Sequence, residues 1–232
     1  MPLGSIITRN APLLVLAGCA ACGPGGGPPA GAPASRSPAA PPATAVADDR
    51  PVVLFLGTSL TAGYGLDPSE AYPAAIQRKI DAAGLRYRAV NAGVSGETSA
   101  GALRRLDWVL RQPVAVLVLE TGANDALRGQ EPEATRANVQ AIFDRARKQA
   151  TPPRLVLVAM EALPNYGDVY RRRFRALFPE LARANDAVLV PFLLEGVAGV
   201  PALNQSDGIH PTAEGQEKAA DNVWKALRPL LS

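Results

Sequence analysis

Histidine and cysteine are scarce in this chain of 232 residues, which contains one histidine, His210, and two cysteines, Cys19 and Cys22. Any step that needs an imidazole near neutral pH must use His210, and a zinc site built from two or three histidines is excluded. Because both cysteines lie near the N-terminus, the rest of the chain can hold no disulfide, catalytic thiolate or cysteine metal site. These two counts therefore argue against a metal site made of histidine or cysteine side chains.

Strong charge and long apolar runs are also missing. The 24 Lys and Arg against 21 Asp and Glu leave a formal net charge of +3, which is too small to indicate a nucleic-acid-binding protein. The apolar run Ala11–Gly18 has eight residues, whereas a membrane-spanning helix needs about 20. A run of this length after Arg9 is instead typical of a secretory signal peptide.

The apolar run ends in L-A-G-C at Leu16–Cys19, which resembles the lipobox of bacterial lipoproteins. The resemblance implies cleavage before Cys19 and acylation of the Cys19 thiol. The protein would then be held by a lipid anchor in a bacterial cell-envelope membrane, facing the periplasm or the cell surface. An ordinary secretory signal that is cleaved nearby is the alternative, and both interpretations predict export.

The segment from Ala20 to Ala47 is rich in Pro, Gly, Ala and Ser and has almost no large apolar side chain. Such a composition buries too little surface to offset the entropy of ordering and is typical of a disordered linker. We therefore expect three parts, namely a lipoprotein-type signal peptide at 1–18, a linker at 19–49 and one folded domain at 50–232. The last span is long enough for a single hydrophobic core.

Short apolar runs alternate with amphipathic, helix-like stretches in the expected domain. The runs are rich in leucine and β-branched valine, as is typical of parallel strands that are covered on both faces. Strands are expected at Val52–Leu56, Tyr87–Asn91, Val114–Leu119, Leu155–Met160 and Val188–Phe192. Their alternation with helices predicts a three-layer α/β/α sandwich around a flavodoxin-like parallel five-stranded sheet.

Several helix ends can be read from the sequence. Asp67–Glu70 (DPSE) combines a capping aspartate, a first-turn proline and a glutamate three residues after the cap. This pattern predicts a helix that begins there and stops at Gly84. The same reasoning predicts helices over Glu133–Gln149 and Thr212–Leu227.

Polar, glycine-containing segments lie beyond four of the predicted strands. They are Gly57–Tyr64, Asn91–Thr98, Thr121–Asp125 and Ser206–Pro211. Because the carboxyl ends of parallel strands share one edge of the sheet, where ligands bind, we expect these segments to converge. They would bring together a serine, a backbone amide, a carboxamide and an Asp/His pair.

These segments resemble the four sequence blocks of the SGNH (GDSL-type) hydrolase family, and more narrowly its arylesterase, thioesterase and lysophospholipase branch. The blocks are matched in order by Ser59, Gly93, Asn124 and His210, with Asp207 three residues before the histidine. The resemblance implies that Ser59 is the nucleophile, that His210 is its base and that Asp207 orients the imidazole. It also implies an oxyanion hole made by the Ser59 and Gly93 amides and the Asn124 side chain.

One residue departs from the family pattern, because Thr58 stands where the family has an aspartate. That aspartate is not one of the catalytic groups, so the assignment of the nucleophile is unaffected. The Thr58 hydroxyl can still form local hydrogen bonds, although the rigidity of the loop or the turnover could suffer.

Simpler roles exist for each of the site residues. Ser59 and His210 could each cap a helix, Gly93 could be an ordinary turn glycine, and Asn124 could belong to an Asx turn. For Asp125 we expect a role in bracing the loop and not in catalysis.

The sequence and the resemblance therefore predict a lipid-anchored serine hydrolase that cleaves small carboxylic esters or thioesters through an acyl-enzyme on Ser59. We expect this hydrolase to need neither a cofactor nor a metal. Apolar loops at Leu163–Gly167 and Leu193–Leu203 would flank a shallow cleft for the acyl or aryl group. A carbohydrate deacetylase or O-acyltransferase that uses the same triad is one alternative. A non-catalytic binding lipoprotein of the cell envelope, in which Thr58 marks a decayed site, is another.

Overall fold

A parallel sheet of five strands lies at the centre of the structure, a computed structural model that describes residues 48–232. The strand order is β2-β1-β3-β4-β5. The strands are β1 (Val52–Gly57), β2 (Arg88–Gly93), β3 (Val116–Glu120), β4 (Arg154–Val158) and β5 (Val188–Val190). The predicted signal peptide, Cys19 and the predicted linker up to residue 47 lie outside the described residues.

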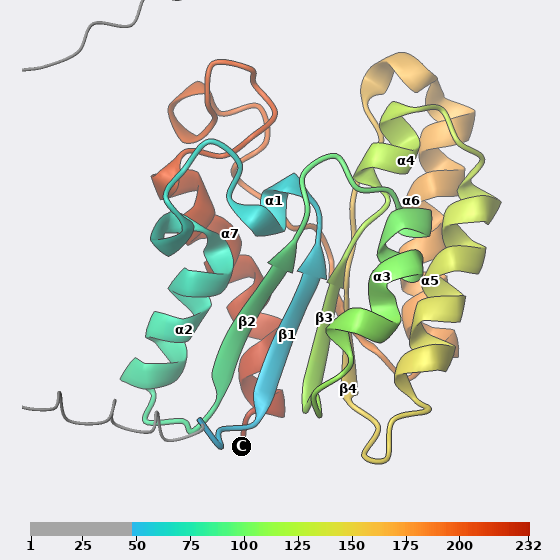
Figure 1. Cartoon of the computed structure of the whole chain (residues 1–232). Coiled ribbons are helices and arrows are strands. Elements are labelled where there is room, and N and C mark those ends of the chain that lie inside the picture. The colour runs from blue at the N-terminus through green and yellow to red at the C-terminus, as the bar shows by residue number, and fades with distance from the viewer. Residues whose placement is uncertain (1–47) are drawn as a thin grey trace, which may run out of the picture. The chain divides into compact units, whose positions relative to one another are not determined.

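Helices cover both faces of the sheet (Figure 1). On one face α2 (Tyr72–Ala82) packs against α7 (Ala213–Leu227). On the other face α3 (Ser99–Val109), α5 (Pro132–Ala146) and α6 (Asp168–Ala184) pack side by side. These layers and the strand order confirm the predicted three-layer sandwich with a flavodoxin-like sheet. In residues 48–232 no helix is both long enough and apolar enough to cross a membrane.

The apolar runs form the core of the sandwich. Every residue of β1 and β3 is buried, because these two strands are flanked by other strands and covered by both helical layers. Phe55 of β1 meets Tyr72 of α2 edge to face, with ring centroids 5.7 Å apart. The other helical layer contributes Phe143, Phe174 and Phe178, which are fully buried.

The helix that was predicted to begin at Asp67 differs in the structure. The capping box of Asp67 and Glu70 forms as expected, but it caps only the 3-10 turn η1 (Pro68–Glu70). The chain is then extended at Ala71 (φ −64°, ψ 147°), and α2 begins at Tyr72. A single helix from Asp67 was therefore wrong, whereas the predicted stop at Gly84, which has a positive φ of 67°, agrees with the end of α2.

The carboxyl ends of the strands meet at one edge of the sheet, which carries most of the irregular structure (Figure 1). Two very short helices start there, α1 (Ser59–Ala62) after β1 and α4 (Ala123–Leu127) after β3. The 3-10 turns η2 (Pro164–Tyr166) and η3 (Pro201–Leu203) lie in the loops before α6 and α7, and η4 (Arg228–Leu230) follows α7. The four polar, glycine-containing segments were expected to converge at this edge.

Candidate active site

Ser59 is the first residue of α1 and follows β1 through a tight turn. The turn needs a glycine before Thr58, because a Cβ on Gly57 would lie 2.0 Å from Thr61 Oγ1. From the neighbouring strand β2, the Asn91 side-chain amide donates a hydrogen bond to the Thr61 carbonyl at 2.8 Å. These contacts fix the short helix at the carboxyl edge and hold Ser59 at its start.

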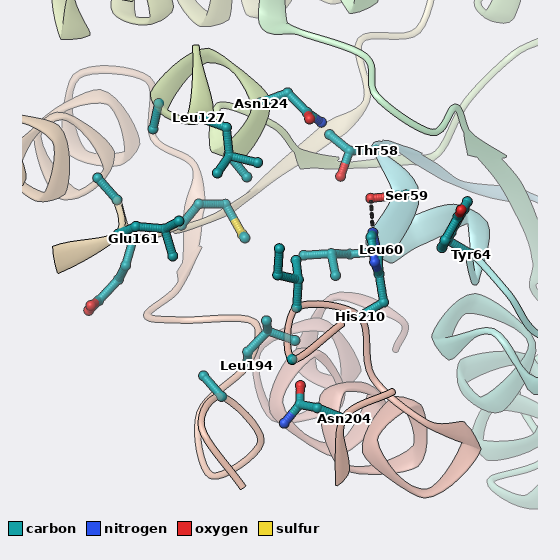
Figure 2. A pocket seen from close by; sticks show the side chains of 18 of the residues that line it. Thr58, Ser59, Leu60, Tyr64, Asn124, Leu127, Glu161, Leu194, Asn204 and His210 are labelled. Carbon is teal, nitrogen blue, oxygen red and sulfur yellow. Dashed lines mark hydrogen bonds between the residues drawn. The ribbon is translucent and has the colours of Figure 1, made fainter. Parts of the chain in front are cut away.

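Ser59, His210 and Asp207 form one chain of hydrogen bonds. The Ser59 Oγ lies 2.9 Å from Nε2 of His210 (Figure 2), and Nδ1 of the same ring lies 2.6 Å from Oδ2 of Asp207. The structure thus brings together three residues that are up to 151 positions apart in the sequence. This order of a hydroxyl, an imidazole and a carboxylate is that of an activated serine nucleophile.

The three-residue spacing of Asp207 and His210 works through a tight turn. Asp207 Oδ1 accepts hydrogen bonds from the backbone N–H groups of Ile209 and His210, at 2.9 and 3.0 Å. The bond to the imidazole, followed by these two backbone bonds, lowers the pKa of Asp207 well below its usual range. Asp207 is therefore an ionised partner for an imidazolium.

Gln205 ties the histidine loop to the nucleophile loop. Its backbone N–H donates to the His210 carbonyl at 2.7 Å, and its side-chain amide donates to the carbonyls of Tyr64 and Pro211 at 2.7 and 2.9 Å. The Tyr64 ring lies against the imidazole, with centroids 4.6 Å apart. Together these contacts leave His210 little freedom to turn away from Ser59.

Asn124 lies in α4 on the other side of Ser59. Its side-chain amide donates one hydrogen bond to the Glu97 carbonyl at 3.0 Å, which fixes the orientation of the group. Within residues 48–232 its second N–H has no acceptor, so it can bind an oxygen atom of a ligand. Figure 2 shows this amide directed toward the side of the cavity where Ser59 lies. Asn124 is thus positioned as the sequence predicts.

Gly93 is not placed as the sequence predicts. It is the last residue of β2, its N–H donates to Asn91 Oδ1 at 2.9 Å, and it does not line the cavity beside Ser59. A Cβ on Gly93 would lie 2.3 Å from the backbone nitrogen of Ala62, so its absence lets α1 pack closely on β2. Gly93 thus has a packing role within a strand, which differs both from the expected oxyanion role and from the alternative of an ordinary turn glycine.

Gly96 occupies the place that was expected for Gly93. It lies in the loop beyond β2 and lines the cavity next to Ser95. Within residues 48–232 neither the Gly96 N–H nor the Ser59 N–H donates a hydrogen bond to another residue. The segment Asn91–Thr98 contains both glycines, and the structure shows that Gly93 ends β2 whereas Gly96 lies past the end of the strand.

Asp125 has the bracing role that we expected. Its side chain is fully buried and accepts hydrogen bonds from the Ser99 N–H at 2.8 Å, from the Ser99 hydroxyl and from the Thr135 hydroxyl at 3.3 Å. It therefore joins the start of α3 to α5 beneath Asn124.

Glu120 is a residue that the sequence analysis missed. Its buried carboxylate accepts hydrogen bonds from the Thr58 N–H at 2.8 Å, from the Thr58 hydroxyl at 3.0 Å and from the Thr61 hydroxyl at 2.9 Å. The Thr61 hydroxyl also meets the Tyr72 hydroxyl at 2.9 Å. Burial, the dominant influence, raises the pKa of Glu120. The sequence signal for Glu120 was a glutamate directly after the apolar run of the third predicted strand. The bond from the Thr58 hydroxyl to Glu120 is the kind of local hydrogen bond that the sequence allowed for Thr58.

A cavity of about 430 Å³ opens beside Ser59 and His210. Most of its wall is apolar, and Leu127 and Leu194 approach it from opposite sides (Figure 2). Both loops that the sequence singled out contribute, through Leu163 and Pro164 after β4 and through Leu194 and Ala198 before the histidine loop. The volume lies in the range of small-molecule sites. In residues 48–232 no cluster of three or more His, Cys, Asp or Glu side chains forms a possible metal site.

Comparison with known proteins agrees with this geometry. The model of the GDSL-like lipase/acylhydrolase family matches residues 55–218. The chain is 39% identical to esterase TesA of Pseudomonas aeruginosa over 180 residues, covering 77% of this chain and 89% of that protein. It is 39% identical to thioesterase 1/protease 1/lysophospholipase L1 of Escherichia coli K12 over 182 residues, covering 78% and 85%.

A solved structure extends the comparison to three dimensions. The crystal structure of TesA aligns with a TM-score of 0.73 at 40% identity, covering 78% of this chain and 99% of that chain. The residues that the family model matches, 55–218, include all four sequence blocks. The chain therefore belongs to the GDSL-like lipase/acylhydrolase family, the SGNH hydrolases, and is a carboxylic ester hydrolase.

Proposed function

We propose that the chain cleaves carboxylic esters and thioesters through an acyl-enzyme on Ser59, with His210 as the acid and base and Asp207 as its orienting carboxylate. The observation that carries this proposal is the continuous Ser59–His210–Asp207 hydrogen-bond chain, with distances of 2.9 and 2.6 Å. An assembled triad also argues against a decayed, non-catalytic site, despite Thr58. The names of the relatives, an esterase and a thioesterase/lysophospholipase, support the substrate class.

The reaction follows from the placement of the groups. The Ser59 oxygen attacks the carbonyl carbon while His210 Nε2 accepts the hydroxyl proton, and the resulting imidazolium is stabilised by Asp207. As the bond to the leaving group breaks, the same proton moves to the departing alcohol or thiol. A water molecule then attacks the acyl-enzyme, again giving its proton to His210, and Ser59 regains a proton when the carboxylic acid leaves.

The negative charge on the carbonyl oxygen needs hydrogen-bond donors that are already in position. We assign this oxyanion hole to the N–H groups of Ser59 and Gly96 and to the free N–H of Asn124. The two backbone donors have no other partner in residues 48–232, and Ser59, Gly96 and Asn124 all line the cavity. Gly93 is not part of this assignment because its N–H is bound to Asn91.

The apolar cavity is the proposed site of the acyl chain. With about 430 Å³, it is far larger than an acetyl group needs. Because each buried CH₂ contributes about 0.8 kcal/mol, kcat/KM should rise about three- to fourfold for each added CH₂ until the cavity is filled. A series of p-nitrophenyl esters from acetate to octanoate tests this, and a flat profile would contradict the assignment of the cavity.

The role of Ser59 can be tested directly. Ser59→Ala should abolish turnover of p-nitrophenyl butyrate and leave the circular dichroism spectrum and the thermal midpoint close to those of the wild type. Ser95→Ala is a matched control, because Ser95 lines the same cavity but has no place in the triad. Turnover by Ser59→Ala at the wild-type rate would contradict the proposal.

We also propose that the protein is exported and held in a bacterial envelope membrane by acyl chains on Cys19. The support is the L-A-G-C sequence at Leu16–Cys19 after a short apolar run. Metabolic labelling with an alkyne-bearing palmitate should mark the wild type, and Cys19→Ser should abolish the label and move the protein out of the membrane fraction. Equal labelling of the two forms would contradict the anchor.

A further inference from the structure

We propose that the rim of the active-site cavity is a docking surface for a phospholipid membrane, so that acyl chains pass from the lipid into the cavity without crossing water. The passage of acyl chains rests on the proposed function, whereas the docking itself does not. The surface consists of seven exposed apolar side chains, which we call the apolar rim. They are Tyr64, Val94, Leu127, Leu163, Val169, Val200 and Ile209.

The exposed apolar side chains are gathered at one end of the molecule. In residues 48–232 eight large apolar side chains are strongly exposed, and seven of them form the apolar rim, with exposed fractions between 39 and 65%. Four of the seven line the cavity itself. The eighth, Trp108, is 64% exposed and lies near the end of α3, away from the carboxyl edge of the sheet (Figure 1). Single exposed apolar residues are ordinary, but a group around one opening indicates a contact surface.

The remaining rim residues, Val94, Val169 and Val200, lie within two positions in the sequence of residues that line the cavity. Val94 precedes Ser95 in the loop after β2, Val169 lies two residues before Arg171, and Val200 lies two residues after Ala198. Ser95, Arg171 and Ala198 line the cavity. The exposed apolar side chains thus belong to the same loops and helix ends that form the wall of the cavity.

The arrangement favours a lipid surface over a folded partner. The seven side chains come from separate loops and helix ends, and none of them belongs to a strand whose edge could bind an extended peptide. The interior that they surround is also mostly apolar, with Met160, Phe192 and Leu194 in its wall. The apolar surface thus continues from the rim to Ser59, and a fluid hydrocarbon layer matches such a path better than a rigid protein does.

The length of the chain before the described domain allows this orientation. The rim lies at the carboxyl edge of the sheet, whereas β1 starts at Val52 on the opposite edge. Between Cys19 and the first described residues lie the 28 residues from Ala20 to Ala47, which can span up to about 90 Å when fully extended. β1 itself, with six residues, is only about 20 Å long. An anchor on Cys19 would therefore keep the domain near a membrane and still let the rim face it.

The test uses vesicles that the enzyme cannot consume. The protein is the mature chain predicted to begin at residue 19, with Cys19→Ser so that no acyl group is attached, and the vesicles contain diether phosphatidylcholine and phosphatidylglycerol. The rim variant combines Val94→Gln, Val169→Gln and Val200→Gln, none of which lines the cavity. Trp108→Gln is the matched control, because it removes an equally exposed apolar side chain away from the rim.

We expect the parent chain to sediment with the vesicles, the rim variant to bind at least roughly tenfold more weakly and Trp108→Gln to bind within about twofold of the parent. Absence of vesicle binding by the parent, or an equal loss in Trp108→Gln, would overturn the proposal. Turnover of soluble p-nitrophenyl butyrate by the rim variant should equal that of the parent. Binding that depends on the rim supports the docking surface whether or not this ester is hydrolysed, so a failure of hydrolysis counts against the proposed function alone.

Discussion

Glu120 provides a sharp test of how the nucleophile turn is held. Its carboxylate accepts hydrogen bonds from the Thr58 N–H, the Thr58 hydroxyl and the Thr61 hydroxyl, and Thr58 directly precedes Ser59. Glu120→Leu removes all three acceptor contacts. The Thr61 hydroxyl keeps its contact with Tyr72, so the two donors of Thr58 are the groups left unsatisfied.

The size of the effect follows from these two donors. An unsatisfied buried donor costs about 1–3 kcal/mol, and removal of a buried carboxylate offsets part of that loss. We therefore expect Glu120→Leu to lower the free energy of unfolding by about 2–4 kcal/mol. Because a shift of the nucleophile by about 1 Å can cost up to about 10² in rate, kcat should fall roughly 10- to 100-fold, with little change in KM.

Glu120→Gln is the matched control. A glutamine oxygen placed where Oε2 lies can still accept from the Thr58 N–H and from the Thr61 hydroxyl. We expect this variant to lose less than about 1 kcal/mol of stability and to keep kcat within about threefold of the wild type. Urea unfolding followed by circular dichroism and turnover of p-nitrophenyl butyrate measure both quantities.

The pH dependence of stability adds an independent readout. Burial raises the pKa of Glu120 above its ordinary value of 4.5 in the folded protein, so the folded state binds more protons than the unfolded state above that pH. The contribution of Glu120 to the free energy of unfolding therefore falls as the pH rises from about 4.5. Glu120→Gln lacks this contribution, so its stability relative to the wild type should improve with rising pH. A glutamine variant as unstable and as slow as Glu120→Leu would refute the reasoning.

Further predictions concern the site. Asp207→Asn should lower kcat about 10⁴-fold, because the amide favours the wrong tautomer of the imidazole. In the wild type the pKa of Asp207 lies well below its usual range, so the fall of kcat/KM with acid should fit the binding of one proton. A fall that needs two protons would contradict the ionised state of Asp207. Asn124→Ala should lower kcat about 10²–10³-fold without changing stability, and an unchanged kcat would remove it from the oxyanion hole. Gly57→Ala should destabilise the fold and reduce turnover, because its Cβ would collide with Thr61; a wild-type thermal midpoint would contradict the tight turn.

The five strands could be predicted from the sequence, because each is marked by an apolar run. The predicted ends of the strands differ from those in the structure by only a few residues. The start of α2 could not be predicted in this way. The capping box at Asp67 is satisfied by a single 3-10 turn, so a correct capping signal does not show how many turns follow it.

The candidate site shows the same limit more clearly. Ser59, Asp207 and His210 follow from residue types and spacing, because few side chains can perform these roles. A backbone N–H cannot be identified by residue type, because nearly every residue has one. The choice between Gly93 and Gly96 depends on where β2 ends and on which N–H is already bound to Asn91. Glu120 was missed because its importance lies in contacts with Thr58 and Thr61 that are about 60 residues away in the sequence.

The central claim, that Ser59 forms an acyl-enzyme with the help of His210, is tested most directly by intact mass spectrometry. After reaction with a fluorophosphonate, the wild type should gain one adduct, and peptide mapping should place it on Ser59. His210→Ala should react at least roughly 10³-fold more slowly, while Tyr64→Phe, which keeps the ring beside the imidazole, should react at nearly the wild-type rate. An adduct on any other residue, or equal labelling of His210→Ala, would contradict the account.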